Sequence, residues 1–296
     1  MKKNRFAGFV RISTLFCALS LPALLEAAAP DSTAAAAAKT QPPLWAQAVK
    51  IFEANKDLVP GTVLQKVQEL DDDGRVKSES RAEISIALDG SGKIKTDIVS
   101  ASKDGKDVTA EERKKAEERA KKEAAEEKKK QDAARNVKKE AAKDSPGDSG
   151  EGSKEQSRSF SSGDSPFNPE LHSAVLVTET SSRETIDGRL CIRFGYSYPT
   201  PSEEAPKKKP TMIKGSAWVD EATGRPVKVE FTEDPLPRGA KSMLTTLHYG
   251  SGGNGQWILE RMEFEGRGAF LFFKKRIRGD IAFSDYWKYV EPSSQK

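Results

Sequence analysis

The sequence contains very little of the side-chain chemistry that most metal sites and nucleophilic active sites need. It has two cysteines, Cys17 and Cys191, and two histidines, His172 and His248, in 296 residues. Protein zinc sites take three or four ligands, mainly from these two residue types. Neither histidine has a serine or cysteine partner in a recognisable catalytic motif. We therefore expect no metal site, no cofactor, no catalytic residue and no enzyme activity.

Long apolar runs are also scarce, and the one at residues 12–25 lies close to the amino end. Basic residues precede it and three alanines at 27–29 follow it, which is the order of a cleavable signal peptide. The run is shorter than the ~20 residues that a membrane-spanning helix needs. We expect residues 1–29 to be a signal peptide and the protein to be periplasmic. An uncleaved anchor or a buried helix is the alternative.

Removal of this leader changes the charge and the thiol content of the chain. Four basic residues less one acidic residue in the leader contribute +3 of the formal net charge of +4. The exported chain is then near +1 and lacks the concentrated basic face of a nucleic-acid-binding protein, so we expect no nucleic-acid partner. Cys17 is lost with the leader. Cys191 then has no partner for an internal disulfide, and we expect it to be buried and inert.

The remaining chain begins with a tether and a helix. Residues 30–43 are rich in alanine, threonine and proline, which is typical of a flexible linker. Apolar residues then recur at helical spacing in residues 44–56, with Trp45 near the start. This spacing predicts a short amphipathic helix that covers one face of a sheet.

Alternation of apolar and polar residues predicts about ten strands. The first three are residues 63–70, 77–88 and 93–101. The others are residues 174–180, 189–198, 212–220, 226–232, 242–249, 256–264 and 269–283. Short turn-rich loops join most neighbours, so the strands should be antiparallel. Phe270 to Phe273 are apolar on both faces, which suggests a central strand. The predicted fold is mainly β: a curved antiparallel sheet, or incomplete barrel, with an amino-terminal lid helix.

A charged insertion interrupts the predicted β domain at residues 105–166. Its first part is dominated by Glu, Lys, Arg and Ala with pairs such as Glu111 and Lys115 at helical spacing, which predicts a solvated helix. A disordered linker rich in Ser, Gly and Asp should follow from residue 144 to about residue 166. Residues 44–104 and 167–291 would then form a single β-rich domain. Interleaved glutamates cancel a steady basic stripe, which disfavours binding to acidic lipid or polymer.

Three short motifs resemble ligand-binding loops but lack the required context. Gly250, Gly252 and Gly255 have the spacing of a dinucleotide loop, yet strands flank them where a helix should follow. Residues 90–93 resemble the end of a phosphate loop without its preceding glycine. Residues 71–74 contain three aspartates before a glycine, but Ala82 stands where a calcium loop needs glutamate. Turn chemistry explains these loops better.

Three segments carry a resemblance to a known family. They are Ala217-Trp218-Val219-Asp220, then Thr223-Gly224-Arg225-Pro226-Val227, then Pro235-Leu236-Pro237, with later aromatic segments at Phe270 to Phe273 and Phe283 to Trp287. The chain after His172 is similar in these features to the outer-membrane lipoprotein carrier and sorting superfamily. The resemblance implies a strongly curved, incomplete barrel closed by helices, with an apolar cavity that takes up acyl chains without metal or nucleotide. The charged insertion is a departure from that family.

The candidate ligand-binding residues are apolar and lie on the predicted strands. They are Leu190, Ile192, Phe194, Trp218, Val229, Phe231, Trp257, Phe270 and Phe272. Sheets always bury one face, so these side chains are either a ligand lining or plain core.

The first functional hypothesis is an exported, non-enzymatic protein that binds a lipid acyl chain or a lipidated protein and makes peripheral contact with a membrane. The alternative is an envelope interaction or scaffold protein that uses the charged insertion as a spacer or as an arm for an envelope protein partner. An envelope hydrolase is the third. A filled gap beneath the lid helix favours the scaffold, and an apolar void favours the carrier.

Overall fold

The computed structural model describes residues 41–90, 92, 94–122, 125, 165–169, 174–200, 211–236, 239–253, 255–270 and 273–290. The predicted signal peptide, most of the predicted tether and most of the predicted linker lie outside these residues. Contacts divide the chain into two units. One comprises residues 1–36 and 109–157, and the other comprises residues 37–108 and 158–296. Each unit is described by itself.

The second unit contains one helix, α2 (Pro43–Ala54), and a set of strands that all pair antiparallel in its described residues. The strands are β1 (Leu58–Val59), β2 (Thr62–Leu70), β3 (Val76–Leu88), β4 (Ile94–Lys103), β5 (Lys106–Asp107), β6 (Leu176–Ile186), β7 (Arg189–Thr200), β8 (Thr211–Asp220), β9 (Pro226–Asp234), β10 (Ala240–Ser251), β11 (Trp257–Phe270), β12 (Phe273–Ser284) and β13 (Trp287–Lys288). The predicted helix and the mainly β class are confirmed.

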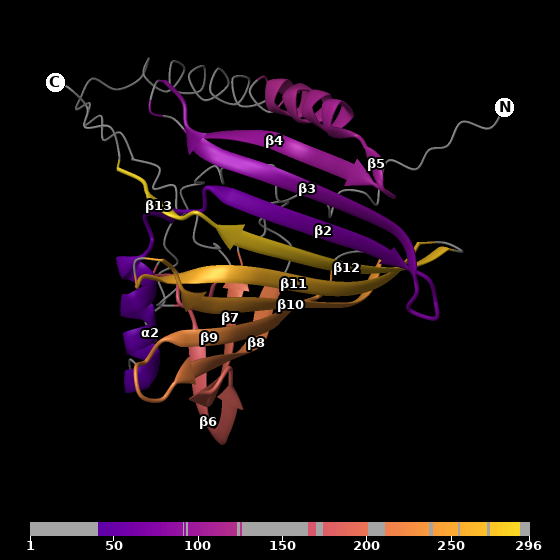
Figure 1. Ribbon diagram of the computed structural model, residues 1–296. Coiled ribbons are helices and arrows are strands. Elements are labelled where there is room, and N and C mark those ends of the chain that lie inside the picture. The colour runs from indigo at the N-terminus through magenta and orange to yellow at the C-terminus, as the bar shows by residue number, and fades with distance from the viewer. Residues whose placement is uncertain are drawn as a thin grey trace, which may run out of the picture. The chain divides into compact units, whose positions relative to one another are not determined.

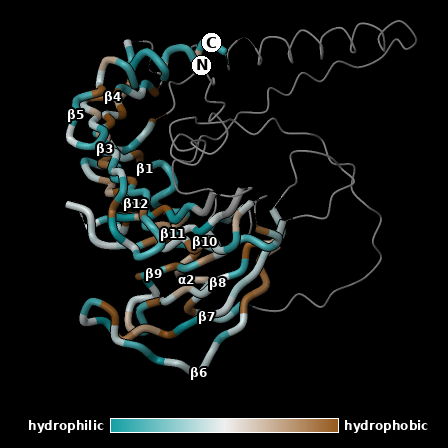
Figure 2. Tube along the Cα trace, turned by 90° about the vertical axis from the view of Figure 1, so that its right-hand side faces the viewer, coloured by the Kyte–Doolittle hydropathy of each residue, from teal (hydrophilic) through white to brown (hydrophobic). Residues whose placement is uncertain are grey.

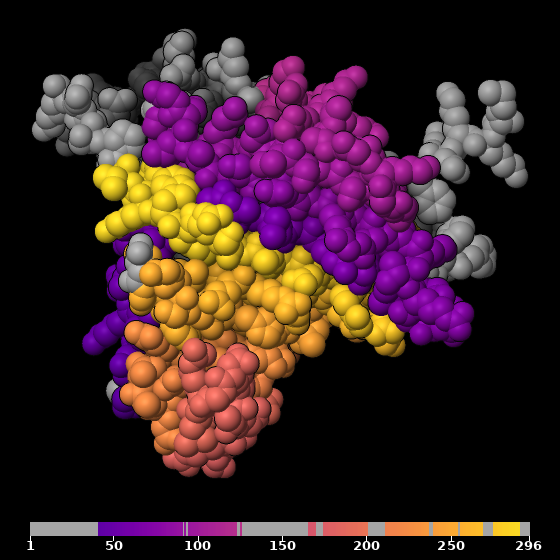
Figure 3. All heavy atoms as spheres, in the orientation of Figure 1, coloured from indigo at the N-terminus to yellow at the C-terminus, as the bar shows by residue number. Residues whose placement is uncertain are grey.

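Eleven of the strands form one curved, open sheet in the order β5-β4-β3-β2-β12-β11-β10-β9-β8-β7-β6 (Figures 1 and 2). The first and last parts of the chain meet where β2 pairs with β12, with Val63 opposite Phe283. Figure 3 shows this contact as indigo strands lying against yellow ones. Because β5 and β6 are the two edges, the chain leaves the sheet at one edge and re-enters it at the other.

The two faces of the sheet differ in polarity. Directly opposite residues on paired strands share a face. One such row runs through Phe194, Ala217, Val229, Leu247, Met262 and Ile281, all of them buried. We call the side that carries this row the apolar face and the other side the polar face. The predicted alternation in β9 is confirmed, because Val227, Val229 and Phe231 are buried.

The prediction of one strand over residues 269–283 is wrong. β11 continues to Phe270 and β12 begins at Phe273, and these two residues pair directly with each other. Phe270 and Phe273 therefore belong to two antiparallel strands and not to one central strand. The sequence between them contains no Gly, Pro, Asn or Asp, so the four apolar residues read as a continuous strand. The strand predicted to end at residue 180 also extends further, to Ile186, before the turn at Asp187 and Gly188.

Two of the predicted turns are confirmed in detail. At the β2–β3 turn the backbone N–H of Arg75 donates to Asp71 Oδ1 at 2.8 Å, and Gly74 has a φ of 84° that favours glycine. At the β10–β11 turn the N–H of Gly252 donates to the carbonyl of Gln256 at 2.8 Å. These loops are hairpin turns, as their sequences predicted.

In the first unit, residues 109–122 are helical and none of their side chains is buried. Lys115 Nζ lies 2.8 Å from Glu111 Oε1 and 2.8 Å from Glu112 Oε1, which confirms the predicted pairing of residues 111 and 115. Across the described ranges, no helix combines the length and the hydropathy needed to cross a membrane.

Candidate binding site on the apolar face

Helix α2 covers part of the apolar face at the end of the sheet where β8 turns into β9 (Figure 1). Its buried residues, Trp45, Ala48, Val49 and Phe52, recur at helical spacing and form one side of the helix. On its exposed side, Gln47 Nε2 donates to the carbonyl of Thr223 in the β8–β9 turn at 2.9 Å. The helix therefore packs on the sheet through apolar side chains and is attached to a turn by a hydrogen bond.

Trp45 is the centre of an aromatic cluster beneath this helix. It is completely buried, and its ring centroid lies 5.7 Å from that of Phe194 and 6.0 Å from that of Tyr196. Tyr196 in turn stacks on Tyr198 with centroids 6.2 Å apart. The indole N–H of Trp45 has no hydrogen-bond acceptor among the described residues. The cluster therefore contains one unsatisfied polar group, and a buried donor without an acceptor costs about 1–3 kcal/mol.

The position of Tyr196 depends on a glycine in the neighbouring strand. Gly215 on β8 lies directly opposite Tyr196, and a Cβ there would be 2.0 Å from the carbonyl oxygen of Glu230 and 2.8 Å from the tyrosine ring. Both distances are too short for any side chain. Gly215 is thus required for the tyrosine ring to lie across β8, where its hydroxyl donates to the Glu230 carbonyl at 3.4 Å.

A second cover on the apolar face is the segment of residues 165–169, which belongs to no strand of the sheet. Phe167 is completely buried and its ring centroid lies 4.7 Å from that of Trp45. Ser165 and Asn168 are also buried, and Ser165 Oγ lies 3.1 Å from the hydroxyl of Tyr249 on β10. The carboxy-terminal end of the linker predicted to be disordered, Ser165 and Pro166, is therefore packed into the core.

The two covers and the sheet pack closely together, and Trp45, Phe167 and Phe194 are completely buried. Among the described residues, a pocket of about 40 Å³ lies between the carboxy-terminal part of α2 and the adjoining ends of β9, β10 and β11. Its lining residues are Ile51, Phe52, Asn55, Leu58, Pro226, Tyr249, Trp257, Ile258, Leu259 and Tyr286. The Tyr286 hydroxyl donates to the carbonyl of Leu259 at 2.5 Å, and burial raises the pKa of this phenol. Pockets for drug-sized ligands are roughly 300–1,000 Å³, so this one does not hold an acyl chain.

The structure brings together six of the nine candidate ligand-binding residues. Ile192, Phe194, Trp218, Val229, Phe231 and Trp257 are all buried in the core cluster that contains Trp45. Trp218 lies on the polar face, with Arg193 and Lys228 over its ring at 5.3 and 4.7 Å. Trp257 also lines the small pocket, and its indole N–H donates to the carbonyl of Pro226. In the structure these side chains contact other protein groups, and a role in binding a ligand stays a prediction.

The other three candidates do not join this cluster. Leu190 is 50% exposed. Phe270 ends β11 and its side chain is not described, and Phe272 lies outside the described residues.

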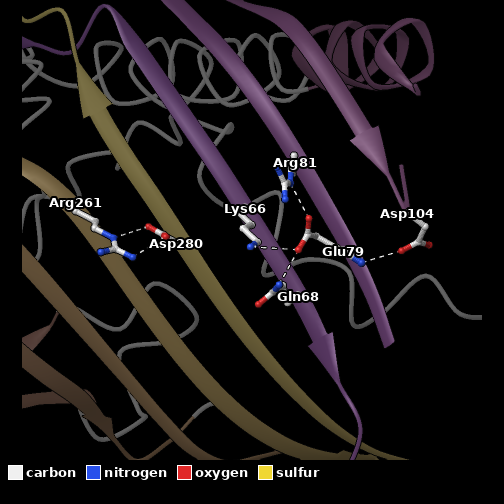
Figure 4. A network of polar contacts seen from close by, with 7 residues as sticks. All are labelled: Lys66, Gln68, Glu79, Arg81, Asp104, Arg261 and Asp280. Atoms are coloured by element: carbon white, nitrogen blue, oxygen red, sulfur yellow. Dashed lines mark hydrogen bonds and ion pairs between the residues drawn. The ribbon is translucent and has the colours of Figure 1, made fainter. Parts of the chain in front are cut away.

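The polar face carries cross-strand ion pairs (Figure 4). Arg261 forms a bidentate ion pair with Asp280, with N–O distances of 2.8 and 2.7 Å. Glu79 on β3 accepts from Gln68 at 2.7 Å and from Arg81 at 2.6 Å, and Lys66 lies 3.3 Å away. The hydrogen bonds from Gln68 and Arg81, with that from Lys66, lower the pKa of Glu79 to about 2. These are the contacts that stabilise neighbouring strands.

The few reactive side chains of the chain do not assemble into a site in the described part. No group of three or more His, Cys, Asp or Glu side chains that could hold a metal ion occurs in the described ranges. Cys191 is a buried free thiol, as predicted, and burial raises its pKa. His248 lies on the polar face 3.6 Å from Glu263, and His172 lies outside the described residues.

Comparison with known proteins finds no matching family model and no matching curated protein. Among solved structures the chain is similar to a DUF1329 family protein from Desulfovibrio piger, with a TM-score of 0.32 and 10% identity over 84% of this chain and 93% of that one. It is also similar to the MucA/MucB complex of Pseudomonas aeruginosa, with a TM-score of 0.19 and 9% identity over 83% and 99% of the two chains. TM-scores this low support no functional argument. The resemblance to the lipoprotein carrier superfamily therefore stays a prediction.

Proposed function

We propose that this chain is an exported, non-enzymatic interaction or scaffold protein of the periplasm. In this proposal the β domain is a rigid body and the charged insertion is a spacer or an arm that binds an envelope protein. The observation that carries the proposal is the close packing beneath α2, where Trp45, Phe167 and Phe194 are completely buried and the pocket at the carboxy-terminal part of the helix is about 40 Å³. Such packing favours the scaffold hypothesis.

The described part of the charged arm also supports binding to another molecule. Most of the stability of a helix in a protein comes from packing an apolar face, yet residues 109–122 bury no side chain. A helix that is polar all round serves as a bridge between bodies or is stabilised by charge pairs such as Lys115 with Glu111. The exposed surface of mixed charge on this helix suits a partner of complementary charge pattern.

The route of the chain dictates how the arm can be tested. The insertion connects the two edge strands of an eleven-stranded sheet, β5 and β6. At about 4.8 Å per strand interval the path along the sheet is roughly 48 Å, which is about 14 fully extended residues. Deletion of the whole arm would leave this connection little slack, because residues 165–169 are also packed on the apolar face. The arm is therefore better replaced by a Gly/Ser segment of equal length.

The experiment replaces residues 109–157 with Gly/Ser, leaving Ser165 to Asn168 in place. Wild-type and replaced chains are cross-linked in the envelope of the source cells, and the attached proteins are identified by mass spectrometry. The control carries Leu176→Ser, a change at an exposed position of β6. We expect the partners of the wild type to persist in the control and to be lost from the replaced chain. Recovery of the same partners with all three chains would contradict the proposal.

The second candidate function is binding of a lipid acyl chain or a lipidated protein at the apolar face. The specific observation in its favour is that the Phe167 segment is a small cover. Exposing Phe167 costs about 1.5–3 kcal/mol, which roughly two to four buried methylenes would offset at about 0.8 kcal/mol each. Lifting α2 would expose Trp45, Val49 and Phe52 at about three times that cost. An acyl chain would thus enter by displacing the segment.

Two measurements test this second candidate. Native mass spectrometry of the protein purified from its own envelope should detect a bound lipid, and a fluorescent fatty acid should bind to it. The Gly/Ser replacement should leave both results unchanged, because it does not touch the apolar face. Absence of lipid and of fatty-acid binding would remove this function and leave the scaffold proposal standing.

A further inference from the structure

The segment of residues 165–169 occupies a socket that the sheet and helix α2 build around it. Phe167 fills the centre of the socket against Trp45, and Ser165 lies within hydrogen-bond distance of Tyr249. Within the segment, the N–H of Phe167 donates to Ser165 Oγ at 3.4 Å and the N–H of Asn168 donates to the Ser165 carbonyl at 3.0 Å. The segment thus lies in the socket as a compact turn with prolines on both sides of its aromatic residue.

We propose that this socket is a peptide-binding site, and that residues 165–169 are its tethered internal ligand. The external ligand would be a segment of another protein that carries an aromatic side chain between prolines, as Ser165-Pro166-Phe167-Asn168-Pro169 does. This inference goes beyond the scaffold proposal, because it assigns a second binding surface that does not involve the charged arm.

The chemistry of the socket favours a peptide over an acyl chain. Its wall offers aromatic rings for a phenyl group and the hydroxyl of Tyr249 for a polar partner. It also contains the completely buried indole N–H of Trp45, which has no acceptor among the described residues. A peptide can offer a backbone carbonyl to such a donor, whereas an acyl chain would leave the indole N–H unsatisfied. The socket therefore has one donor that its internal ligand does not use.

Covalent attachment makes the internal ligand a competitor. A tethered segment acts at an effective concentration that is typically in the millimolar range, so it keeps the socket closed against a peptide of equal intrinsic affinity. An external ligand binds in proportion to the fraction of chains whose socket is open. A variant whose segment cannot fill the socket should therefore bind the same peptide more tightly.

The test uses a fluorescein-labelled synthetic peptide with the sequence of residues 162–171, SGDSPFNPEL. It is titrated against full-length chains by fluorescence anisotropy. We expect the Phe167→Ala chain to bind it at least about tenfold more tightly than the wild type does. Ser165→Ala, which keeps the ring and removes the contact with Tyr249, should give a smaller gain. A peptide with alanine in place of its phenylalanine should bind to none of the chains.

Three outcomes would overturn the proposal: binding of the peptide to neither chain, equal binding to both, or tighter binding of the alanine peptide. A fluorescent fatty acid is titrated in parallel. A gain for the fatty acid without a gain for the peptide would overturn the peptide assignment in favour of an acyl site.

Hydrogen exchange in the wild type provides a test that does not depend on the folding of Phe167→Ala. If the segment is an exchangeable ligand, it opens without unfolding of the sheet. The amide of Asn168 should then exchange faster than the amides of β9, and the labelled peptide in excess should accelerate it further. Exchange of Asn168 at the same rate as β9, unaffected by the peptide, would make the segment a permanent part of the core and overturn the proposal.

Discussion

The rings of Trp45 and Phe167 lie with their centroids 4.7 Å apart, and both side chains are completely buried. The two residues come from opposite sides of the charged insertion, one from α2 and one from the segment just before β6. The sheet supplies the floor beneath them through residues such as Phe194. The apolar face is therefore closed by two covers that meet each other, and the stability of each depends on the other.

Replacement of Trp45 by alanine should destabilise the protein strongly. The change removes the aromatic side chain that contacts Phe167, Phe194 and Tyr196, and Phe/Trp→Ala changes in cores cost about 3–5 kcal/mol. The measurement is the free energy of unfolding in urea. Gln47→Ala is the matched control on the same helix, because it removes only the exposed hydrogen bond to Thr223 and should cost about 1 kcal/mol or less. Equal effects of the two changes would mean that α2 is not docked as described.

Substitution of Gly215 by alanine should lower the free energy of unfolding. The added methyl group would meet the Glu230 carbonyl at 2.0 Å and the ring of Tyr196 at 2.8 Å, so β8 and β9 must separate or the tyrosine must move. Overpacking of this kind costs about 1–3 kcal/mol.

Gly90→Ala is the control for this change. Gly90 has nothing within 4 Å of its added Cβ and is not among the glycines with positive φ, so its replacement should change the free energy of unfolding by less than about 0.5 kcal/mol. Similar urea midpoints for the two variants would refute the close approach of Tyr196 to β8.

Local patterns predicted the elements of this fold well where alternation was clean. Val227, Val229 and Phe231 alternate with Lys228 and Glu230, and that period alone placed β9 and its buried face correctly. Alternation failed where several apolar residues follow one another, because a period of two then cannot be read. This is why residues 270–273 were predicted to belong to one strand.

The site itself was harder to predict, because it depends on contacts between distant parts of the chain. Phe167 stands in a stretch rich in Ser, Gly, Asp and Pro, whose composition predicted disorder. The available signal was one aromatic residue flanked by two prolines inside that stretch. Nothing local indicated that Trp45 and the ring of Phe194 would surround it. Likewise, the pairing of β2 with β12, which joins the first strands of the chain to the rest of the sheet, follows from no short-range pattern.

The acid stability of the protein should depend on Glu79. Its pKa is about 2 in the folded chain because Gln68, Arg81 and Lys66 stabilise the carboxylate, against 4.5 in the absence of such contacts. A lowered pKa stabilises the fold at pH values above about 4.5, and this contribution is lost as the pH falls towards 2. The difference in free energy of unfolding between wild type and Glu79→Gln should therefore be largest at pH 7 and should shrink from pH 4.5 downwards.

Urea unfolding at pH 7, 4 and 3 measures this difference, and an NMR titration of the Glu79 carboxyl group should give a midpoint near 2. Because the surrounding pairs are partly exposed, 0.5 M salt should reduce the difference at pH 7. A titration midpoint of 4 or above would show that the network around Glu79 is not formed.

The thiol of Cys191 should resist chemical modification in the folded protein. Its side chain is buried, and burial raises its pKa, so both access and the fraction of reactive thiolate are low. Exposure requires opening of β7 from β6 and β8, where Cys191 lies opposite Glu184 and Asp220. At pH 8, in a chain carrying Cys17→Ser, labelling by a disulfide reagent should be at least about 100-fold slower than in urea, which corresponds to a cost of about 2.7 kcal/mol for opening β7, a strand paired on both sides.

The control is a chain in which Cys191 is replaced by serine and Ser100, at an exposed position of β4, is replaced by cysteine. Its labelling rate is that of a freely accessible thiol on the same protein. Labelling of Cys191 at that rate in the folded chain would contradict its burial. Because Cys191 is protected by strands and not by the Phe167 segment, Phe167→Ala should leave its protection largely unchanged provided that the sheet is folded. The same reaction therefore separates an open socket from an open sheet: tighter peptide binding with slow labelling of Cys191 means that only the segment has been displaced.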